Sequence, residues 1–285
     1  MIPASFGYVA PRSVADVVDL LAERGDEVKV MAGGQSLIPL LRLRLAAPEA
    51  VVDLRALDEL RVVEDLGPVY RVGAMVTHRA FIESAVARSW GAVRDAGVDL
   101  ADPLVRNRGT FGGSLAHADP AGDWPAIALV LGATCRVRGS AGIREIGADD
   151  FFTSLFTTAL GGDELLTHVD IPKPAPGTYS GYVKVPHPAS GYPVVGAGVS
   201  ITVEDGISRA VRLALTGVAT TAVRARAAEA FLVGKALTPE TIAAAAALSA
   251  SGIDVIGDSY APEAYRRHLI EVVCRRVISR MRVPG

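Results

Sequence analysis

The fold is decided by the stretch Val28-Lys29-Val30-Met31-Ala32-Gly33-Gly34-Gln35-Ser36-Leu37. It begins as a short apolar strand, passes through two glycines and a polar turn, and ends at a serine expected to cap a helix over residues 37–45. Because glycine has no Cβ, backbone N–H groups beside it can approach a ligand closely. Such amides and the positive end of a helix dipole together favour an anion. We call Ala32–Ser36 the first glycine loop.

The same chemistry recurs in Arg106-Asn107-Arg108-Gly109-Thr110-Phe111-Gly112-Gly113-Ser114, the second glycine loop. Neither loop matches the dinucleotide fingerprint G-x-G-x-x-G, and neither has the lysine of a Walker loop. A tight turn between a strand and a helix is the ordinary explanation for one glycine pair. Two such loops in one chain instead suggest a ligand with two linked phosphates, held from both sides.

Composition limits the class of protein. The chain has 285 residues, of which 50% are hydrophobic and 21% charged, as in an ordinary globular protein with ample core. The net charge of −2 gives no reason to expect nucleic acid as a partner. No apolar run is long enough to span a membrane, and the first residues lack the pattern of a signal peptide. We expect a cytoplasmic protein, either soluble or peripheral at the inner face of the membrane.

The apolar spacing divides the chain into three units. Residues 1–55 read as a small α/β unit of alternating helices and strands, with predicted elements at 13–24, 28–31, 37–45 and 51–54. Ser13 is expected to cap the first helix and Gly25 to end it.

Residues 56–176 form the second predicted unit. Its predicted strands are 60–63, 69–73, 135–138, 143–146 and 165–171. Its predicted helices are 77–87, 92–100 and 119–131. Thr77 is expected to cap the first of these helices, and Asp119 followed by Pro120 to begin the last.

Residues 177–285 follow a run rich in proline and form the third predicted unit. It contains three alternating strands, 180–185, 194–203 and 210–218, with a hairpin turn at Glu204-Asp205-Gly206. Three predicted helices follow at 222–233, 239–250 and 262–281, and Thr238-Pro239 begins the second. The unit is therefore predicted to be a three-stranded antiparallel sheet backed by a helical bundle.

Several polar residues permit more than one role. On one helix, Asp119 and Asp123 would share a face, where they could accept sugar hydroxyls or, with His117, bind a metal; capping by Asp119 is the simpler explanation. Cys135 and Cys274 are too few to ligate an iron–sulfur cluster and are expected to be buried thiols. No serine elbow or zincin spacing indicates hydrolysis.

The last predicted helix is rich in arginine. A solvated basic face and a docking face for an acidic partner are both compatible with this pattern. The arginines are Arg266, Arg267, Arg275, Arg276, Arg280 and Arg282.

With both loops in view, the sequence resembles the flavin-binding medium subunits of molybdenum hydroxylases, above all those of the aerobic carbon monoxide dehydrogenase type; the flavin domain of xanthine dehydrogenase is more distant. The matching segments are Ala32–Leu37 with Pro39–Leu45, Gly73-Ala74 with Thr77-His78, and Arg106–Ser114 with Asp119-Pro120 and Asp123. The resemblance covers nearly the whole chain. It implies an α+β protein: a two-subdomain FAD-binding fold of the vanillyl-alcohol oxidase type (PCMH-like), followed by a C-terminal domain of the CO dehydrogenase flavoprotein kind.

The resemblance also assigns cofactor-binding residues. It places Ala32, Gly33, Gly34, Gln35 and Ser36 of the first loop, and Thr110, Phe111, Gly112, Gly113 and Ser114 of the second, around the FAD pyrophosphate. It also makes Leu37, which follows the first loop, a cofactor-binding residue. Asp123 would reach the ribityl chain or the flavin edge, and Leu165 or Leu166 would pack on the ring. Lys184 would stand near the flavin, and Tyr192 matches an aromatic position close to it. This chain has Gly191 before that tyrosine, where the family often has an acidic residue.

The implied function is that of an FAD subunit that transfers electrons. A small subunit with [2Fe–2S] clusters and a large subunit with a molybdenum cofactor would complete a heterotrimer, and the trimers would pair. The acceptor could be a quinone, NAD or another molecule, and no side chain of this chain need act as an acid or base. Two alternatives stay open: a self-sufficient flavin oxidase or dehydrogenase, and a nucleotide-binding subunit without a redox role. The substrate, whether CO, a purine, an N-heterocycle or an aldehyde, is selected in another chain.

Overall fold

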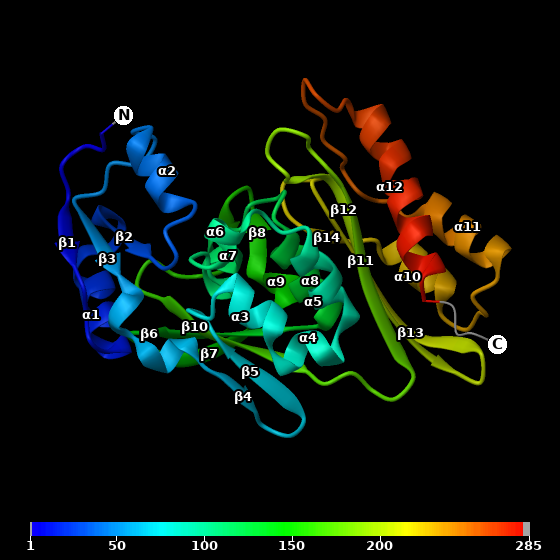
Figure 1. Ribbon diagram of the computed structural model, residues 1–285, viewed down its shortest axis with the longest axis horizontal. Coiled ribbons are helices and arrows are strands. Elements are labelled where there is room, and N and C mark those ends of the chain that lie inside the picture. Colours follow the sequence, from blue (N-terminus) through cyan, green and yellow to red (C-terminus); the bar gives the residue numbers. More distant parts are fainter. Residues whose placement is uncertain (1, 282–285) are drawn as a thin grey trace.

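The computed structural model describes residues 2–281. Three main β-sheets succeed one another along the molecule: a small N-terminal sheet, a five-stranded central sheet and a C-terminal sheet backed by helices (Figure 1). None of the described helices combines the length and apolarity needed to cross a membrane.

The N-terminal sheet is parallel, with the strand order β1-β3-β2. Its elements are β1 (Gly7–Val9), α1 (Val14–Arg24), β2 (Val28–Met31), α2 (Leu37–Arg42) and β3 (Ala50–Asp53). Ser13 caps α1 in a capping box with Asp16, and Gly25 ends the helix, as predicted. The sequence did not reveal β1, because all three of its residues are exposed and it pairs with a strand far away in the chain.

The central sheet has the order β4-β5-β10-β6-β7, and all neighbouring strands are antiparallel. The elements of this part are β4 (Val63–Asp65), β5 (Val69–Gly73), α3 (His78–Glu83), α4 (Ala85–Ser89), α5 (Gly91–Val98), α6 (Pro103–Arg106), α7 (Phe111–His117), α8 (Asp123–Leu131), β6 (Thr134–Gly139), β7 (Gly142–Gly147), α9 (Ala148–Phe151), β8 (Phe152–Ser154), β9 (Thr157–Thr158) and β10 (Leu165–Pro172). Every residue of α8 is buried, and its side chains share one core with the inward face of the sheet.

The C-terminal sheet has the order β11-β12-β13-β14. Its elements are β11 (Thr178–Pro186), β12 (Pro193–Glu204), β13 (Ile207–Thr216), β14 (Val223–Arg224), α10 (Arg226–Leu232), α11 (Pro239–Leu248) and α12 (Glu263–Ser279). Helices α10 and α12 pack on one face, with α11 against them, while α5 and α8 pack on the other (Figure 1). The first nine residues of β12 are buried, as expected for a strand covered on both faces.

The structure corrects several predicted elements. The first half of the stretch predicted as strand 60–63 belongs to a 3₁₀ helix that ends at Arg61, and the strand β4 begins only at Val63. The predicted helix 77–87 is two helices, because the backbone of Ser84 is extended. The helix expected from Asp119-Pro120 starts at Asp123 with Gly122 as its cap, so Asp119 and Asp123 do not share a helical face. A short fourth strand, β14, joins the predicted three-stranded sheet.

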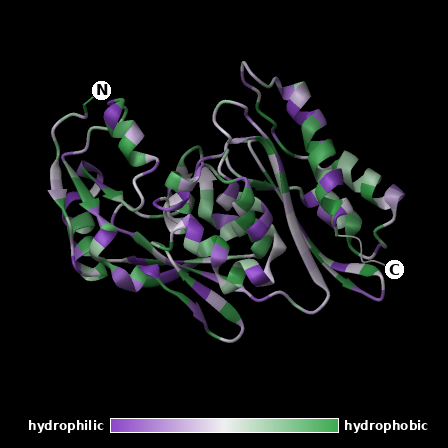
Figure 2. Ribbon diagram, viewed as in Figure 1, coloured by the Kyte–Doolittle hydropathy of each residue, from purple (hydrophilic) through white to green (hydrophobic). Residues whose placement is uncertain are grey.

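The predicted basic face of the last helix is also smaller than expected. Arg266 is buried and donates hydrogen bonds to the backbone of Ala261 and Val194 and to Asp258. Arg282 lies outside the described residues. Hydrophobic and hydrophilic residues both occur along α12 (Figure 2), and its buried side chains face β11 and β12.

Candidate functional site

The two glycine loops touch. A Cβ placed on Gly33 would lie 2.2 Å from the carbonyl oxygen of Arg108 and 2.6 Å from the Cα of Gly109. Only glycine therefore allows this close approach of one loop to the other. The structure thus brings together the two stretches that the sequence singled out, although about 70 residues of chain separate them.

A cavity of about 130 Å³ opens where the loops meet. Strands β2 and β3 are parallel, with Met31 paired to Asp53, so the residues that follow the two strands reach the same edge. The lining residues are Ala32, Gly33, Asp53, Arg55, Arg61, Met75, Thr77, Asn107, Arg108 and Thr110. Three guanidinium groups and one carboxylate give the cavity a positive balance, which suits a diphosphate.

Asp53 holds this edge in place. Its carboxylate accepts hydrogen bonds from the Tyr8 hydroxyl at 2.8 Å, the Arg55 amide at 2.9 Å and Arg55 Nε at 2.6 Å. Burial raises the pKa of Asp53, but the hydrogen bonds from Tyr8 and Arg55 outweigh it, and the pKa is lowered overall. Asp53 is thus charged and orients Arg55 at the wall of the cavity.

The first glycine loop has free amides. Within residues 2–281, the N–H groups of Gly33, Gly34, Gln35 and Ser36 have no hydrogen-bond acceptor. Gly34 adopts φ +75°, a left-handed conformation that favours glycine. The predicted capping by Ser36 is wrong: its side chain makes no cap hydrogen bond, and α2 ends at Arg42. A ligand can therefore use the loop amides, whereas the helix dipole of so short a helix contributes little.

In the second glycine loop, only the amide of Thr110 has no hydrogen-bond acceptor among the described residues. The N–H groups of Phe111 and Gly112 donate to Val76 and Ala74, and those of Gly113 and Ser114 donate to the side chain and carbonyl of Thr110. A Cβ on Gly112 would lie 2.5 Å from the Cα of Ala74. The close approach served by Gly112 is thus to protein backbone, and Phe111 is part of the core.

His78 fixes the second loop through hydrogen bonds of its backbone and its side chain. Its amide donates to the carbonyl of Gly109 at 2.9 Å, and its Nδ1 accepts a hydrogen bond from Trp124 Nε1 at 3.0 Å. Burial lowers the pKa of His78 to about 4, so the ring is neutral at pH 7. The sequence pointed to His78 only as part of a matching segment.

Asp123 and Lys184 form an ion pair with each other, and neither lines one of the two cavities. The Tyr182 hydroxyl donates to Asp123 at 2.7 Å, and Lys184 Nζ lies 3.1 Å from the same carboxylate. All three side chains are almost fully buried. Burial raises the pKa of Asp123, and this effect outweighs the lowering by Lys184 and Tyr182. Burial, followed by the nearby charge of Asp123, raises the pKa of Tyr182 well above its usual value. This cluster joins α8 to β11.

Tyr192 lies at a second, larger cavity of about 290 Å³. Pro120 and Ala121 form one wall, and His187, Tyr260 and the buried Arg266 form others. Tyr192 is 46% exposed, so part of its ring is free to contact a ligand. Burial, followed by the charges of Asp119 and Asp123, raises the pKa of the Tyr192 hydroxyl.

Helix α7 connects the two cavities. Its N-cap, Thr110, lines the smaller cavity, and Pro120 lies three residues beyond its last residue, His117, at the larger one. A helix of seven residues is about 10 Å long. An elongated ligand with a diphosphate at one end could therefore extend along α7 toward Tyr192.

Leu165 and Leu166 lie on opposite faces of β10. Leu165 is buried in the core of the N-terminal unit and Leu166 in the central core. The two cysteines are free and buried, as expected, and burial raises the pKa of both thiols to about 12. They are correspondingly unreactive.

The fold agrees with the comparisons to known proteins. Residues 4–174 match the FAD binding domain in molybdopterin dehydrogenase, and residues 180–281 match the CO dehydrogenase flavoprotein C-terminal domain. The chain therefore belongs to the family of FAD-binding flavoproteins of molybdopterin dehydrogenases. It is an oxidoreductase chain whose cofactor is FAD, as its resemblance to this family implied.

Individual relatives span the whole chain. The carbon monoxide dehydrogenase medium chain of Afipia carboxidovorans is 37% identical over 98% of both chains. The nicotine 6-hydroxylase medium subunit of Paenarthrobacter nicotinovorans is 38% identical over 95% of both. Among solved structures, carbon monoxide dehydrogenase from Hydrogenophaga pseudoflava matches with a TM-score of 0.94, at 36% identity and 98% coverage of each chain. Quinoline 2-oxidoreductase from Pseudomonas putida matches with a TM-score of 0.92, also at 36% identity, covering 99% of this chain and 98% of that one.

Proposed function

We propose that this chain is the electron-transfer subunit of a heterotrimeric molybdenum hydroxylase. It would receive electrons from [2Fe–2S] clusters of a small subunit and pass them to an external acceptor such as a quinone or NAD. A large subunit with the molybdenum cofactor would oxidise the substrate, and two trimers would associate in the cytoplasm. The names of the relatives support a multisubunit oxidoreductase, since they are described as medium chains or medium subunits.

One observation carries the proposal: the arginine-lined cavity where Ala32 and Gly33 of the first glycine loop meet the second loop, next to loop amides that have no acceptor among the described residues. The amides of residues 33–36 would bind the FAD pyrophosphate, and Arg55, Arg61 and Arg108 would neutralise its charge. Bound FAD supplies the chemistry, which is to collect single electrons and deliver them in pairs.

The other predicted site residues take supporting roles. Residues 111–114 would fix the second loop beside the pyrophosphate, because their amides are already engaged within the protein. Thr110, whose side chain caps α7, lines the cavity itself. Tyr192 would contact the flavin ring at the larger cavity. The buried ion pair of Asp123 and Lys184 would hold α8 and β11 together beside the flavin ring. Leu165 and Leu166 would act through the cores on either side of β10.

We also propose three structural units: FAD-binding subdomain 1 at residues 1–55, FAD-binding subdomain 2 at 56–176, and the C-terminal domain at 177–285. The small parallel sheet, the central sheet and the C-terminal sheet each lie within one of these ranges. The proposed diphosphate cavity draws residues from both of the first two units, so FAD would connect them.

The test is the cofactor content of the purified chain and of one variant pair. The wild-type chain should be yellow, with bound FAD and neither iron nor molybdenum. Replacing Arg108 with Gln should weaken FAD binding about ten-fold, because a charge-assisted hydrogen bond is removed. Arg209→Gln is the matched control, since Arg209 is exposed and pairs only with Glu204 among the described residues.

Three results would contradict the proposal. Colourless protein that ignores added FAD would remove its basis. Reduction of the flavin by an organic substrate in the isolated chain would indicate a self-sufficient enzyme instead. Equal affinity for ADP and FAD, with no flavin reduction in the assembled complex, would indicate a non-redox subunit.

A further inference from the structure

The C-terminal sheet is fixed to both ends of helix α8. At the N-terminal end, the Thr216 hydroxyl lies within hydrogen-bond distance of the carbonyls of Pro120 and Gly122, at 2.8 Å each, and the amide of Gly217 also donates to Pro120. The buried cluster of Asp123, Tyr182 and Lys184 lies next to these contacts. This end of α8 is the one that leads to the Tyr192 cavity.

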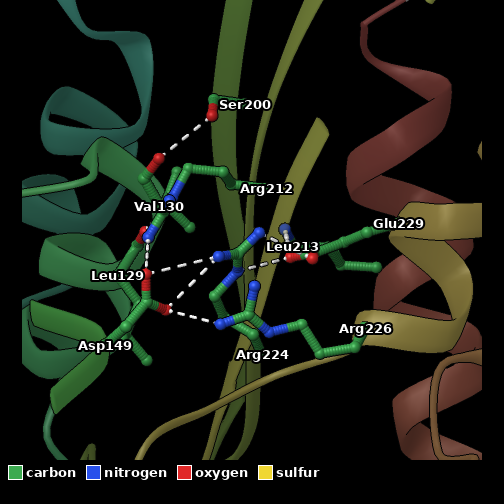
Figure 3. Close-up of polar contacts among 9 residues, drawn as sticks. All are labelled: Leu129, Val130, Asp149, Ser200, Arg212, Leu213, Arg224, Arg226 and Glu229. Carbon is green, nitrogen blue, oxygen red and sulfur yellow. Dashed lines mark hydrogen bonds and ion pairs between the residues drawn. The ribbon is translucent and has the colours of Figure 1, made fainter. Parts of the chain in front are cut away.

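The C-terminal end of α8 is held by side chains of the same sheet. Arg212 Nε donates to the carbonyl of Leu129 at 2.6 Å, and the Ser200 hydroxyl donates to the carbonyl of Val130 at 3.0 Å (Figure 3). The last carbonyls of a helix lack the usual partner within it. Ser200 satisfies that of Val130, and Arg212 adds a second donor to that of Leu129, which also accepts from the amide of Gly132 at 3.2 Å. A cation is also favourable at this end of the helix dipole.

A single carboxylate organises the contacts at this end. Asp149, in the first turn of α9, faces three guanidinium groups of the C-terminal part: Arg212 at 2.7 Å, Arg226 at 3.0 Å and Arg224 at 3.3 Å (Figure 3). Burial raises the pKa of Asp149, but Arg212 and Arg224 outweigh it and lower the pKa overall. Asp149 is therefore charged when it holds these arginines together.

The network continues into the interior of the C-terminal part. The guanidinium of Arg224 also pairs with Glu229, at 2.7 Å. Glu229 in turn accepts a hydrogen bond from the amide of Leu213 in β13, at 2.7 Å. Asp149 is thus linked through Arg224 to the backbone of the sheet, and not only to mobile surface side chains.

We propose that Asp149 is a positioning residue for the flavin ring. It would act by keeping the C-terminal sheet packed against the C-terminal end of α8. This inference rests on the proposed function. Tyr192 directly precedes β12, and Ser200 lies eight residues further along that strand, about 26 Å in an extended chain. Strand β12 is hydrogen-bonded to β11 and β13 along its length. A tilt where Ser200 and Arg212 meet α8 would therefore pivot the sheet about the contacts of Thr216 and Gly217 with Pro120, and so turn Tyr192 at the opposite end. Lys184 on the neighbouring β11 shifts with it.

The charge balance explains why loss of Asp149 should tilt the sheet. Three guanidinium groups face two carboxylates, those of Asp149 and Glu229. Without Asp149, only Glu229 opposes three positive charges, and like charges at this distance repel. The diphosphate cavity contains no residue of this network, so the affinity for the phosphate part should change little.

The experiment compares FAD-loaded full-length chains. In Asp149→Asn, flavin fluorescence per bound FAD should rise several-fold, because Tyr192 no longer quenches the ring, while FAD affinity stays within a few-fold of wild type. Asp149→Glu should restore much of the wild-type fluorescence. Asp150→Asn is the control, since Asp150 forms no hydrogen bond or ion pair within residues 2–281.

Thermal unfolding of the same proteins separates positioning from simple stability. A lower Tm with unchanged flavin fluorescence and visible spectrum would overturn the inference while leaving the proposed function intact. A wild-type chain without FAD would overturn the proposed function itself. If Asp149→Asn does not fold, Arg212→Gln replaces it, because the Arg212 guanidinium donates to the carbonyl of Leu129 and pairs with Asp149, and so joins β13 directly to the end of α8. It should give a smaller rise in fluorescence, and no rise would overturn the inference.

Discussion

The first and second glycine loops have similar sequences but contribute differently to the site. Both contain a glycine pair followed within two residues by serine. Within residues 2–281, the amides of residues 33–36 in the first loop have no acceptor. In the second loop only the amide of Thr110 has none, and the amides of residues 111–114 all have protein acceptors. The first loop is therefore suited to binding a ligand and the second to bracing it.

The difference shows why a glycine pair does not by itself define a phosphate site. Gly33 permits one loop to touch the other, at Arg108. Gly112 permits α7 to pack on the backbone of Ala74, and Gly34 permits a left-handed turn. One residue type thus meets three requirements, which variants can separate.

The largest expected effect is at Gly112. Replacement by Val would drive side-chain atoms into Ala74, whose Cα is 2.5 Å from the position of a Cβ. The free energy of unfolding of the apo chain should fall by about 3 kcal/mol or more, as in an overpacked core. Urea denaturation measures this. Gly162→Ala is the control, because nothing lies within 4 Å of a Cβ there; an equal midpoint for both variants would contradict the bracing role.

Acid should also weaken the second loop, through His78. The pKa of His78 falls from 6.5 to about 4 on folding because the ring is buried. Between these values the unfolded chain binds the proton and the folded one does not, so stability is full above pH 6.5 and is lost toward pH 4. The loss should reach about 3 kcal/mol.

Denaturation as a function of pH tests this prediction. His78→Gln should remove this part of the pH dependence, whereas His268→Gln, at an exposed position on α12, should keep it. Identical pH profiles for wild type and His78→Gln would show that His78 does not destabilise the protein in acid.

The first loop should respond mainly through the cofactor. In Gly33→Ala, the new methyl group would overlap the carbonyl of Arg108 and separate the two loops. We expect FAD affinity to fall about ten-fold, or 1.4 kcal/mol, with a smaller change in apo stability than for Gly112→Val. A fluorescence titration with FAD measures the affinity. Unchanged affinity would mean that the contact between the loops does not shape the diphosphate site.

Local signals in the sequence predicted local structure well. Ser13, Thr77 and Thr238 each cap a helix as expected, because the acceptor and its amide lie within three residues. The signal at Asp119-Pro120 failed, because Thr216 binds the carbonyls of Pro120 and Gly122 and holds this segment outside the helix. Contacts across the fold decided that segment, and no local pattern contains them.

In the candidate site, too, the local patterns could be predicted from the sequence and the contacts across the fold could not. Both glycine loops were found from sequence, but Arg55 and Arg61 in the cavity wall were not. They reach the cavity only because β3 lies beside β2, and their charges resemble those of any surface arginine in the sequence. The pairing of Asp123 with Lys184 was also hidden, since 61 residues separate the two.

The smallest expected effect is a matched pair of hydroxyl deletions, one in each loop. Thr110 Oγ1 accepts the amide of Gly113 at 3.1 Å, so Thr110→Val removes a cap and should lower the free energy of unfolding by about 1 kcal/mol. Ser36 makes no cap hydrogen bond, so Ser36→Ala should leave apo stability almost unchanged. Urea midpoints of the two apo variants measure the difference, and equal losses would mean that Ser36 caps α2 after all. Because valine matches threonine in size, a loss confined to Thr110→Val would assign the bracing of the second loop to its own hydrogen bonds rather than to a bound ligand.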